Sequence, residues 1–209
     1  MSILLAFVAS PAFAVSNEID LQLAWLGAND PRWDSFSGSN TYATGGLRVG
    51  YALTPRLAAV IGWQHGVDGV VIDASGGYAD EDQETVGDTT FKSVFFGDRW
   101  SLGLKGDVAL TRWFHPYATL SGAVLRGLAK LDEEAGDDDN LNQLKGAGLT
   151  GGGEAALGVE FQIRVGDKGR AVAFTTELGY GLYAPVKLGD FGAVQFDGFA
   201  GRVGTGVRF

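Results

Sequence analysis

Apolar and polar side chains alternate along most of the chain. One clear example begins at residue 18, where four apolar side chains alternate with mostly polar ones: Ile19, Leu21, Leu23 and Trp25 against Glu18, Asp20, Gln22 and Ala24. Successive side chains of a strand point to opposite faces, so a period of two predicts β-strands. The pattern recurs at 46–53, 57–63, 100–110, 117–124, 154–163, 172–180 and 199–209, which predicts eight strands.

The connections between these strands alternate in length. Those at 27–43, 67–90, 131–150 and 183–195 are long and polar, whereas those at 54–56, 112–116 and 164–170 are short. Bacterial outer-membrane barrels have long extracellular loops and short periplasmic turns. We therefore predict an all-β fold, an eight-stranded antiparallel up-and-down transmembrane β-barrel in the bacterial outer membrane.

A soluble barrel also alternates, so the two faces must be told apart. Aromatic side chains lie near the predicted strand ends, as the interfacial girdles of a membrane barrel require: Trp25, Tyr42, Trp63, Trp100 and Tyr180 near the long loops, and Tyr51 and Trp113 near the short turns. The polar face combines glycine and alanine with few charges, as a narrow, filled lumen needs. We therefore expect lipid on the apolar side.

Residues 1–14 are predicted to be a signal peptide, with residues 15–209 forming the barrel. Residues 3–9 are a short apolar core, and Ala12-Phe13-Ala14 resembles a cleavage site. The segment is short and has no Lys or Arg after Met1, which leaves two alternatives: a start truncated relative to the true one, or a buried first strand.

Composition excludes several classes of function. The chain of 209 residues has 33 glycines, spread without a repeat, and no cysteine, so neither a disulfide nor a thiolate metal site can form. Its net charge of −9 argues against nucleic acid as a partner, because nucleic-acid binders carry basic patches. A partner that carries exposed cations and meets the acidic loops fits this charge better.

The polar face of the predicted strands carries charges that would point into a narrow lumen. Such buried charges need partners. We expect Glu18 or Asp20 to pair with Arg208, and Glu177 with Arg202, because closure brings the first and last strands together. A structural plug is the favoured interpretation and a gate the alternative. The predicted interior network is Glu18, Asp20, Arg48, Lys105, Asp107, Glu154, Glu160, Glu177, Arg202 and Arg208.

The chain ends in a pattern that resembles the C-terminal sorting signal of bacterial outer-membrane proteins. Residues 202–209 read Arg-Val-Gly-Thr-Gly-Val-Arg-Phe, with Thr205 where the signal prefers an apolar residue. The resemblance implies that Val203, Val207 and Phe209 are recognised by the barrel-insertion machinery. The mature chain as a whole resembles the opacity-type surface proteins and the membrane domain of outer membrane protein A. That likeness implies a fold and transfers no activity.

Candidate chemistry is weak. His65 lies where the site of a lipid-modifying barrel enzyme could sit, but the run Gln64-His65-Gly66-Val67 lacks the serine of the lipid A deacylase pattern. His115 precedes Pro116 in a short turn.

The acidic runs 80–82 and 137–139 do not have EF-hand spacing and are read as solvated loops. Gly151-Gly152-Gly153 lacks a following P-loop lysine and is read as a strand entry.

The sequence thus favours a non-enzymatic surface protein that needs no cofactor, and in which we find no catalytic or metal site. The expected role is structural or interactive, with outer-membrane lipid and lipopolysaccharide around the barrel and an extracellular ligand at the acidic loops. A narrow pore or carrier for small apolar solutes is the main alternative, and a lipid-modifying enzyme is a weaker one.

Overall fold

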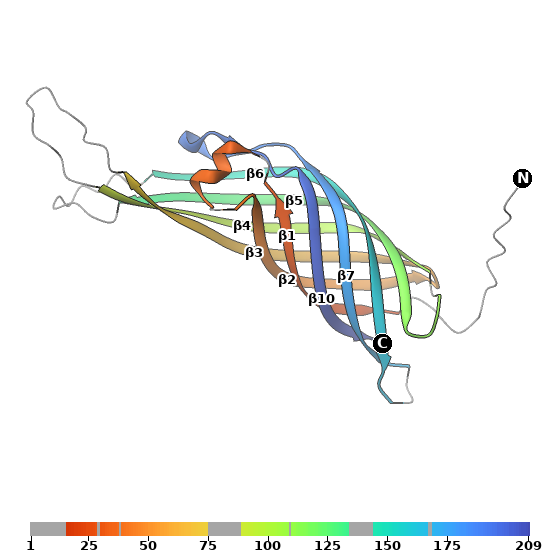
Figure 1. Cartoon of the computed structure of the whole chain (residues 1–209). Helices are drawn as coiled ribbons and strands as arrows, with labels where there is room; N and C mark the ends of the chain where they lie inside the picture. Colours follow the sequence, from red (N-terminus) through yellow and green to blue (C-terminus); the bar gives the residue numbers. More distant parts are fainter. Residues whose placement is uncertain are drawn as a thin grey trace, which may run out of the picture.

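A computed structural model describes residues 16–28, 30–37, 39–74, 89–108, 110–133, 144–166 and 169–209. They form a closed barrel of eight strands (Figure 1): β1 (Glu18–Gly27), β2 (Thr41–Thr54), β3 (Leu57–Ala74), β4 (Thr89–Asp107), β5 (Phe114–Glu133), β6 (Leu144–Arg164), β7 (Ala171–Tyr183) and β10 (Gly198–Arg208). Each strand pairs antiparallel with its neighbour, and β10 closes the barrel against β1. The predicted eight-stranded up-and-down barrel is confirmed. The predicted signal peptide and both acidic runs lie outside the described residues.

One half of the barrel wall is much taller than the other. Strands β3 to β6 have 18, 19, 20 and 21 residues, whereas β1, β2, β7 and β10 have 10 to 14. A tilted strand crosses a bilayer in about 9–11 residues, so the four long strands project well beyond it. Figure 1 shows them extending together past the end of the other strands.

The long strands correct two predicted loops. Strands β3 and β4 reach Ala74 and Thr89, and β5 and β6 reach Glu133 and Leu144, so the predicted loops 67–90 and 131–150 were too long. Alternation fades in these segments because an outward face beyond the hydrocarbon no longer needs apolar side chains. The Gly151-Gly152-Gly153 run was predicted to be a strand entry. Because β6 already begins at Leu144, the run lies within the strand.

The outer surface of the barrel is apolar. Large hydrophobic side chains face outward on every barrel strand, and those near mid-strand are strongly exposed: Leu157 is 71% exposed, Leu178 67% and Leu120 66%. The inward positions carry glycine, alanine and charged residues that are buried. This is the reverse of a soluble barrel, whose apolar face fills the core.

Aromatic side chains ring both ends of the apolar surface. Trp25, Trp63, Trp100 and Tyr180 point outward near the long-loop end, and Tyr51 and Trp113 near the short-turn end. Tyr42 was wrongly predicted to belong to this set. It is only 1% exposed, because it shares the inward parity of Arg48 on β2 and its ring lies in the lumen.

Two of the long connections carry structure of their own at the barrel mouth. The first contains η1 (Pro31–Ser35), a 3-10 helix, and the last contains β8 (Val186–Lys187), η2 (Gly189–Phe191) and β9 (Ala193–Val194). Strands β8 and β9 pair as a small hairpin. No helix in the described part of the chain is long and apolar enough to cross a membrane.

Candidate functional site

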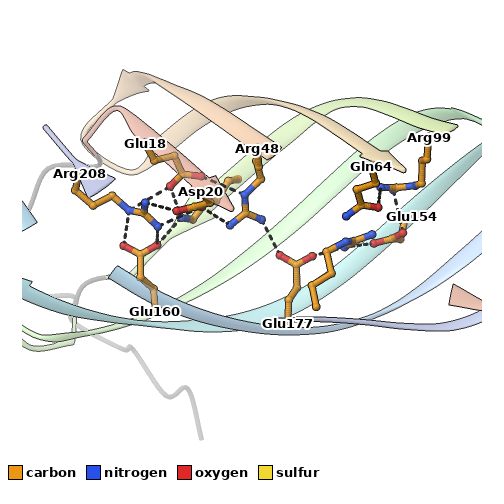
Figure 2. Close-up of polar contacts among 11 residues, drawn as sticks. Glu18, Asp20, Arg48, Gln64, Arg99, Glu154, Glu160, Glu177 and Arg208 are labelled. Carbon is orange, nitrogen blue, oxygen red and sulfur yellow. Dashed lines mark hydrogen bonds and ion pairs between the residues drawn. The ribbon is translucent and has the colours of Figure 1, made fainter. Parts of the chain in front are cut away.

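A cluster of ion pairs fills the half of the lumen nearer the short turns, here called the lower half (Figure 2). The Lys105 ammonium on β4 donates to Glu18 at 2.6 Å and to Glu160 at 2.8 Å, and so joins β4 to β1 and β6. Arg208 on β10 donates to Glu160 and to Asp20, each at 2.6 Å. Each carboxylate of this layer has a cationic partner.

Arg48 links this layer to a second one nearer the mouth. Its guanidinium lies 3.1 Å from Asp20 and 3.0 Å from Glu177. Arg202 then joins Glu177 to Glu154. The two layers therefore form one continuous chain of ion pairs through the lumen.

Arg99 completes the upper layer. Its guanidinium donates to Glu154 at 3.0 Å, to the Gln64 side chain at 3.1 Å and to the Tyr183 hydroxyl at 2.9 Å. Arg99 and Gln64 were not predicted from the sequence, although both share the inward parity of their strands: Arg99 with Lys105 on β4, and Gln64 with the inward positions of β3. Extending the alternation toward the long loops would have found both.

The strand register explains the two predicted pairs. Glu18 lies opposite Arg208 in the β1–β10 ladder, and Arg202 lies opposite Glu177 in the β10–β7 ladder. All ten predicted network residues are buried. Asp107 alone stands apart from the ion-pair chain, 3.4 Å from the His115 imidazole at the short-turn end.

The joined ion pairs balance in charge. Five carboxylates and five cations take part, and all ten are at most 8% exposed: Glu18, Asp20, Glu154, Glu160 and Glu177 with Arg48, Arg99, Lys105, Arg202 and Arg208. The Tyr117 ring adds a further contact, with the Lys105 ammonium 4.6 Å from its centroid. A paired set of this kind neutralises buried charges within the protein. Glu18 Oε1 and Arg48 Nε lie 3.4 Å apart and form an ion pair without a hydrogen bond.

The upper end of the lumen is filled by apolar side chains, here called the mouth cluster: Trp33, Phe36, Tyr42, Phe95, Val186, Leu188, Val194 and Phe196. Trp33, carried by η1, is fully buried at its centre. Its ring centroid lies 5.1 Å from that of Phe95 and 5.2 Å from that of Phe196, both in edge-to-face geometry. These connections were predicted to be long and polar, and no pattern in the sequence indicates this cluster.

Inward glycines make room for the mouth cluster. The Tyr42 hydroxyl donates to the carbonyl oxygens of Gly66 at 2.6 Å and Gly97 at 3.0 Å. A Cβ atom at Gly97 would lie 2.6 Å from that hydroxyl oxygen. Gly146 and Gly148 on β6 likewise lie against the backbone of residues 187 and 188, where any side chain would collide.

Little space is left between the mouth cluster and the ion pairs. Two small cavities, of about 10 and 30 Å³, are lined partly by Gln64, Arg99 and Arg202. A single water needs about 10–15 Å³, so these cavities have room for a few water molecules only. Among the described residues, no cluster of His, Asp and Glu is suited to hold a metal ion.

These observations indicate what surrounds the outer surface of the barrel. A closed ladder with apolar side chains outside and paired charges inside is stable in lipid, where backbone groups must be satisfied within the protein. The chain is an outer-membrane β-barrel. Its short turns and its C-terminus lie at the end that faces the periplasm in such barrels, and its long connections at the extracellular end.

Comparisons with known proteins give structural likenesses only. No family model matches the chain, and no curated protein matches it in sequence. Neisserial surface protein A has a TM-score of 0.45 at 13% identity, over 92% of this chain and 95% of that one. OprG of Pseudomonas aeruginosa has a TM-score of 0.46 at 14% identity, over 95% and 98%. Ail, the attachment invasion locus protein of Yersinia pestis, has 0.41 at 12%, over 92% and 95%.

His65 lies on the outward face. Its Nδ1 atom is 2.9 Å from an Asp98 carboxylate oxygen, and its ring stacks on Trp63 with a centroid distance of 6.3 Å. Its two neighbours across the ladders are Gly45 and Asp98, so neither supplies a hydroxyl nucleophile. This environment favours an interfacial role for His65.

The three residues of the predicted sorting signal, two on β10 and Phe209 directly after it, point outward. Val203, Val207 and Phe209 are 41%, 46% and 55% exposed. The backbone of Phe209 exchanges two hydrogen bonds of 3.1 Å with Asn17, which closes the barrel end. Their recognition by the insertion machinery stays a prediction.

Proposed function

We propose that this protein is a closed, non-conducting barrel that anchors an extracellular interaction surface in the outer membrane. The observation that carries the proposal is the double filling of the lumen, by the mouth cluster and by the ion-pair chain. Either layer alone would obstruct an aqueous path, and the two differ in chemistry. A solute that one layer admits would meet the other.

The energetics of the ion pairs favour a plug over an open pore. A conducting ion would have to separate charges that are buried and paired. Leaving one member of such a pair without its partner typically costs about 3–5 kcal/mol. Because Glu177 bridges Arg48 and Arg202, opening at this point would break two ion pairs together.

The acidic connections favour interaction as the role of the extracellular end. Residues 75–88 contain five carboxylates and residues 134–143 contain four, with no Lys or Arg in either. Strong local charge of one sign speeds encounters with partners of the opposite sign. We propose that these connections meet a partner with exposed cations.

Single-channel recording tests the closed lumen. The mature chain is refolded into planar bilayers, with heat-dependent gel mobility as the check for folding and a large porin as the check that the bilayers report channels. We expect silence from the folded chain. Steady, discrete openings would refute the plug and establish the pore interpretation.

A binding measurement tests the acidic connections separately. The probe is fluorescent polylysine, added to folded protein at 0.05 and 0.2 M salt. The variant Asp137→Asn, Asp138→Asn, Asp139→Asn should bind it more weakly, while Asp107→Asn, which lies in the lumen, should bind it as the natural chain does. Equal binding by both variants would exclude residues 137–139 from the interaction surface.

A further inference from the structure

Three cations project outward from the tall wall, above the ring of aromatic side chains at the long-loop end, here called the outer aromatic ring. Arg126 and Lys130 lie on β5 and Lys145 on β6, and together they are called the outer basic cluster. Their strand neighbours Leu125, Ala129 and Gly146 are buried on the lumen side, so the three cations are on the outer face. The Lys130 ammonium lies 5.5 Å from the ring centroid of Phe96, which is also outside.

The strand register gives the height of each cation above the membrane. Trp100 of the outer aromatic ring lies opposite Val124 on β5. Arg126 is two residues farther along β5 and Lys130 six residues farther. At about 3.4 Å per residue and a strand tilt of about 40°, Arg126 stands about 5 Å above the ring and Lys130 about 15 Å above it.

The upper pair of cations is held in an unfavourable arrangement. Lys130 and Lys145 lie directly opposite each other in the β5–β6 ladder. Like charges at such positions destabilise a sheet. Within the described part of the chain, no carboxylate forms an ion pair with Arg126, Lys130 or Lys145. Asp98 lies opposite Arg126, but it hydrogen-bonds to His65.

Apolar side chains continue between the cations on the same face. Leu149 lies opposite Arg126, and Leu128 lies between Arg126 and Lys130 on β5 and opposite Phe96. An anionic ligand here would therefore meet cations at two heights and an apolar surface between them. A soluble phosphate would use only the cations, whereas a lipid would use both.

We infer that the outer basic cluster binds a phosphorylated glycolipid of the outer leaflet. Arg126 stands at the height of the phosphates next to the acyl chains, and Lys130 and Lys145 stand at the height of phosphates on the adjoining sugars. A phospholipid carries its phosphate at the lower height only. The inference concerns the outer wall and does not depend on whether the lumen conducts.

Two probes separate the two heights. One probe is fluorescein-labelled lipopolysaccharide with a phosphorylated inner core, and the other is the lipid A released from it. Each probe is titrated with folded protein in zwitterionic detergent micelles, and binding is followed by fluorescence anisotropy. Arg126→Gln should weaken binding of both probes about fivefold, the effect expected of one basic residue at an anionic lipid surface. Lys130→Gln with Lys145→Gln should weaken lipopolysaccharide binding about 25-fold and lipid A binding less than about twofold.

The matched control removes three cations at the short-turn end. Arg56, Arg112 and Arg170 are exposed there, and their triple Gln variant should bind both probes as the natural chain does. Equal loss in this control and in the cluster variants would show a net-charge effect and overturn the inference. Displacement of lipopolysaccharide by 10 mM inorganic phosphate would overturn it too, because the cluster would then be a site for free phosphate. Unchanged affinity in the cluster variants would also refute it.

Discussion

Lys105 on β4 reaches across the lumen to Glu18 on β1, with 2.6 Å between the ammonium nitrogen and a carboxylate oxygen. The two strands are not neighbours in the barrel, so this contact joins opposite parts of the wall. The same ammonium also holds Glu160 on β6. Removing it would leave the two carboxylates close together, with Arg208 as their remaining shared cation.

Lys105→Met should therefore destabilise the barrel by about 3–5 kcal/mol, the cost typical of breaking a buried ion pair from one side. Urea unfolding in detergent micelles, followed by tryptophan fluorescence, measures the change. The combined variant Lys105→Met, Glu18→Gln should recover part of the loss because it removes one of the two carboxylates that then share Arg208. An unfolding midpoint for Lys105→Met equal to that of exposed Arg112→Met would refute this account.

Two glycines of β4 should respond very differently to alanine. A Cβ atom at Gly97 would lie 2.6 Å from the Tyr42 hydroxyl oxygen, whereas one at Gly106 would have no atom within 4 Å. Overpacking of this kind costs about 1–3 kcal/mol, so Gly97→Ala should lower the unfolding midpoint and Gly106→Ala should not. Adding Tyr42→Phe to Gly97→Ala should restore part of the stability. If Gly106→Ala destabilises as much, the effect belongs to glycine itself and not to the Tyr42 contact.

The interior could be predicted from sequence only where alternation was visible. The parity of β1, β7 and β10 placed Asp20, Glu177, Arg202 and Arg208 in the lumen, because apolar side chains mark most of the opposite face of these strands. Arg99 escaped because β4 was taken to begin at Trp100. Its earlier residues leave the hydrocarbon, where lipid no longer imposes an apolar outer face.

The mouth cluster could not be predicted for a different reason. Trp33, Phe36 and Phe196 lie in connections without periodicity, and their burial depends on β2 and β4 presenting glycines and Tyr42 at the right height. Such contacts between distant segments have no local signal. Tyr42 itself was misplaced because nearness to a strand end was given more weight than its parity.

Outward positions can be tested at two depths. Leu120 lies near the middle of the lipid-facing surface on β5 and Leu110 near the short turns; they are 66% and 62% exposed. Arginine costs about 2–4 kcal/mol at mid-bilayer and about 0–1 kcal/mol near the interface. Leu120→Arg should therefore reduce the free energy of folding into lipid vesicles far more than Leu110→Arg. Equal effects would contradict the assigned depth of β5.

Trp33→Ala should release the first connection without unfolding the barrel. Trp33 is fully buried between the rings of Phe95 and Phe196, and the neighbouring Arg32 donates to the Ala193 carbonyl at 2.6 Å. We expect trypsin to cleave after Arg32 in the variant, while heat-dependent gel mobility remains. Exposed Trp113→Ala is the control and should resist cleavage there. Resistance in both variants would show that the connection is held by other contacts.

Deleting Phe209 should separate assembly from stability. Because the Phe209 side chain is outward and its deletion removes only the two terminal backbone hydrogen bonds with Asn17, unaided refolding in detergent should change little, yet the folded protein recovered from cell outer membranes should fall several-fold. Deletion of an exposed residue elsewhere is not comparable, so Phe209→Tyr, which keeps a terminal aromatic ring, serves as the control. Normal cellular yield after the deletion would remove Phe209 from the proposed assembly signal.

The equal numbers of positive and negative groups in the joined ion pairs also bear on how the barrel enters the membrane. Since five carboxylates and five cations cancel in the lumen, the net charge of −9 is carried by residues outside that set. The set of joined ion pairs is electrically neutral as a unit once its pairs have formed. Insertion carries the acidic long connections across the bilayer, whereas the joined ion pairs add no net charge to that transfer. A voltage applied across the membrane should therefore act on insertion through the connections and hardly through the lumen.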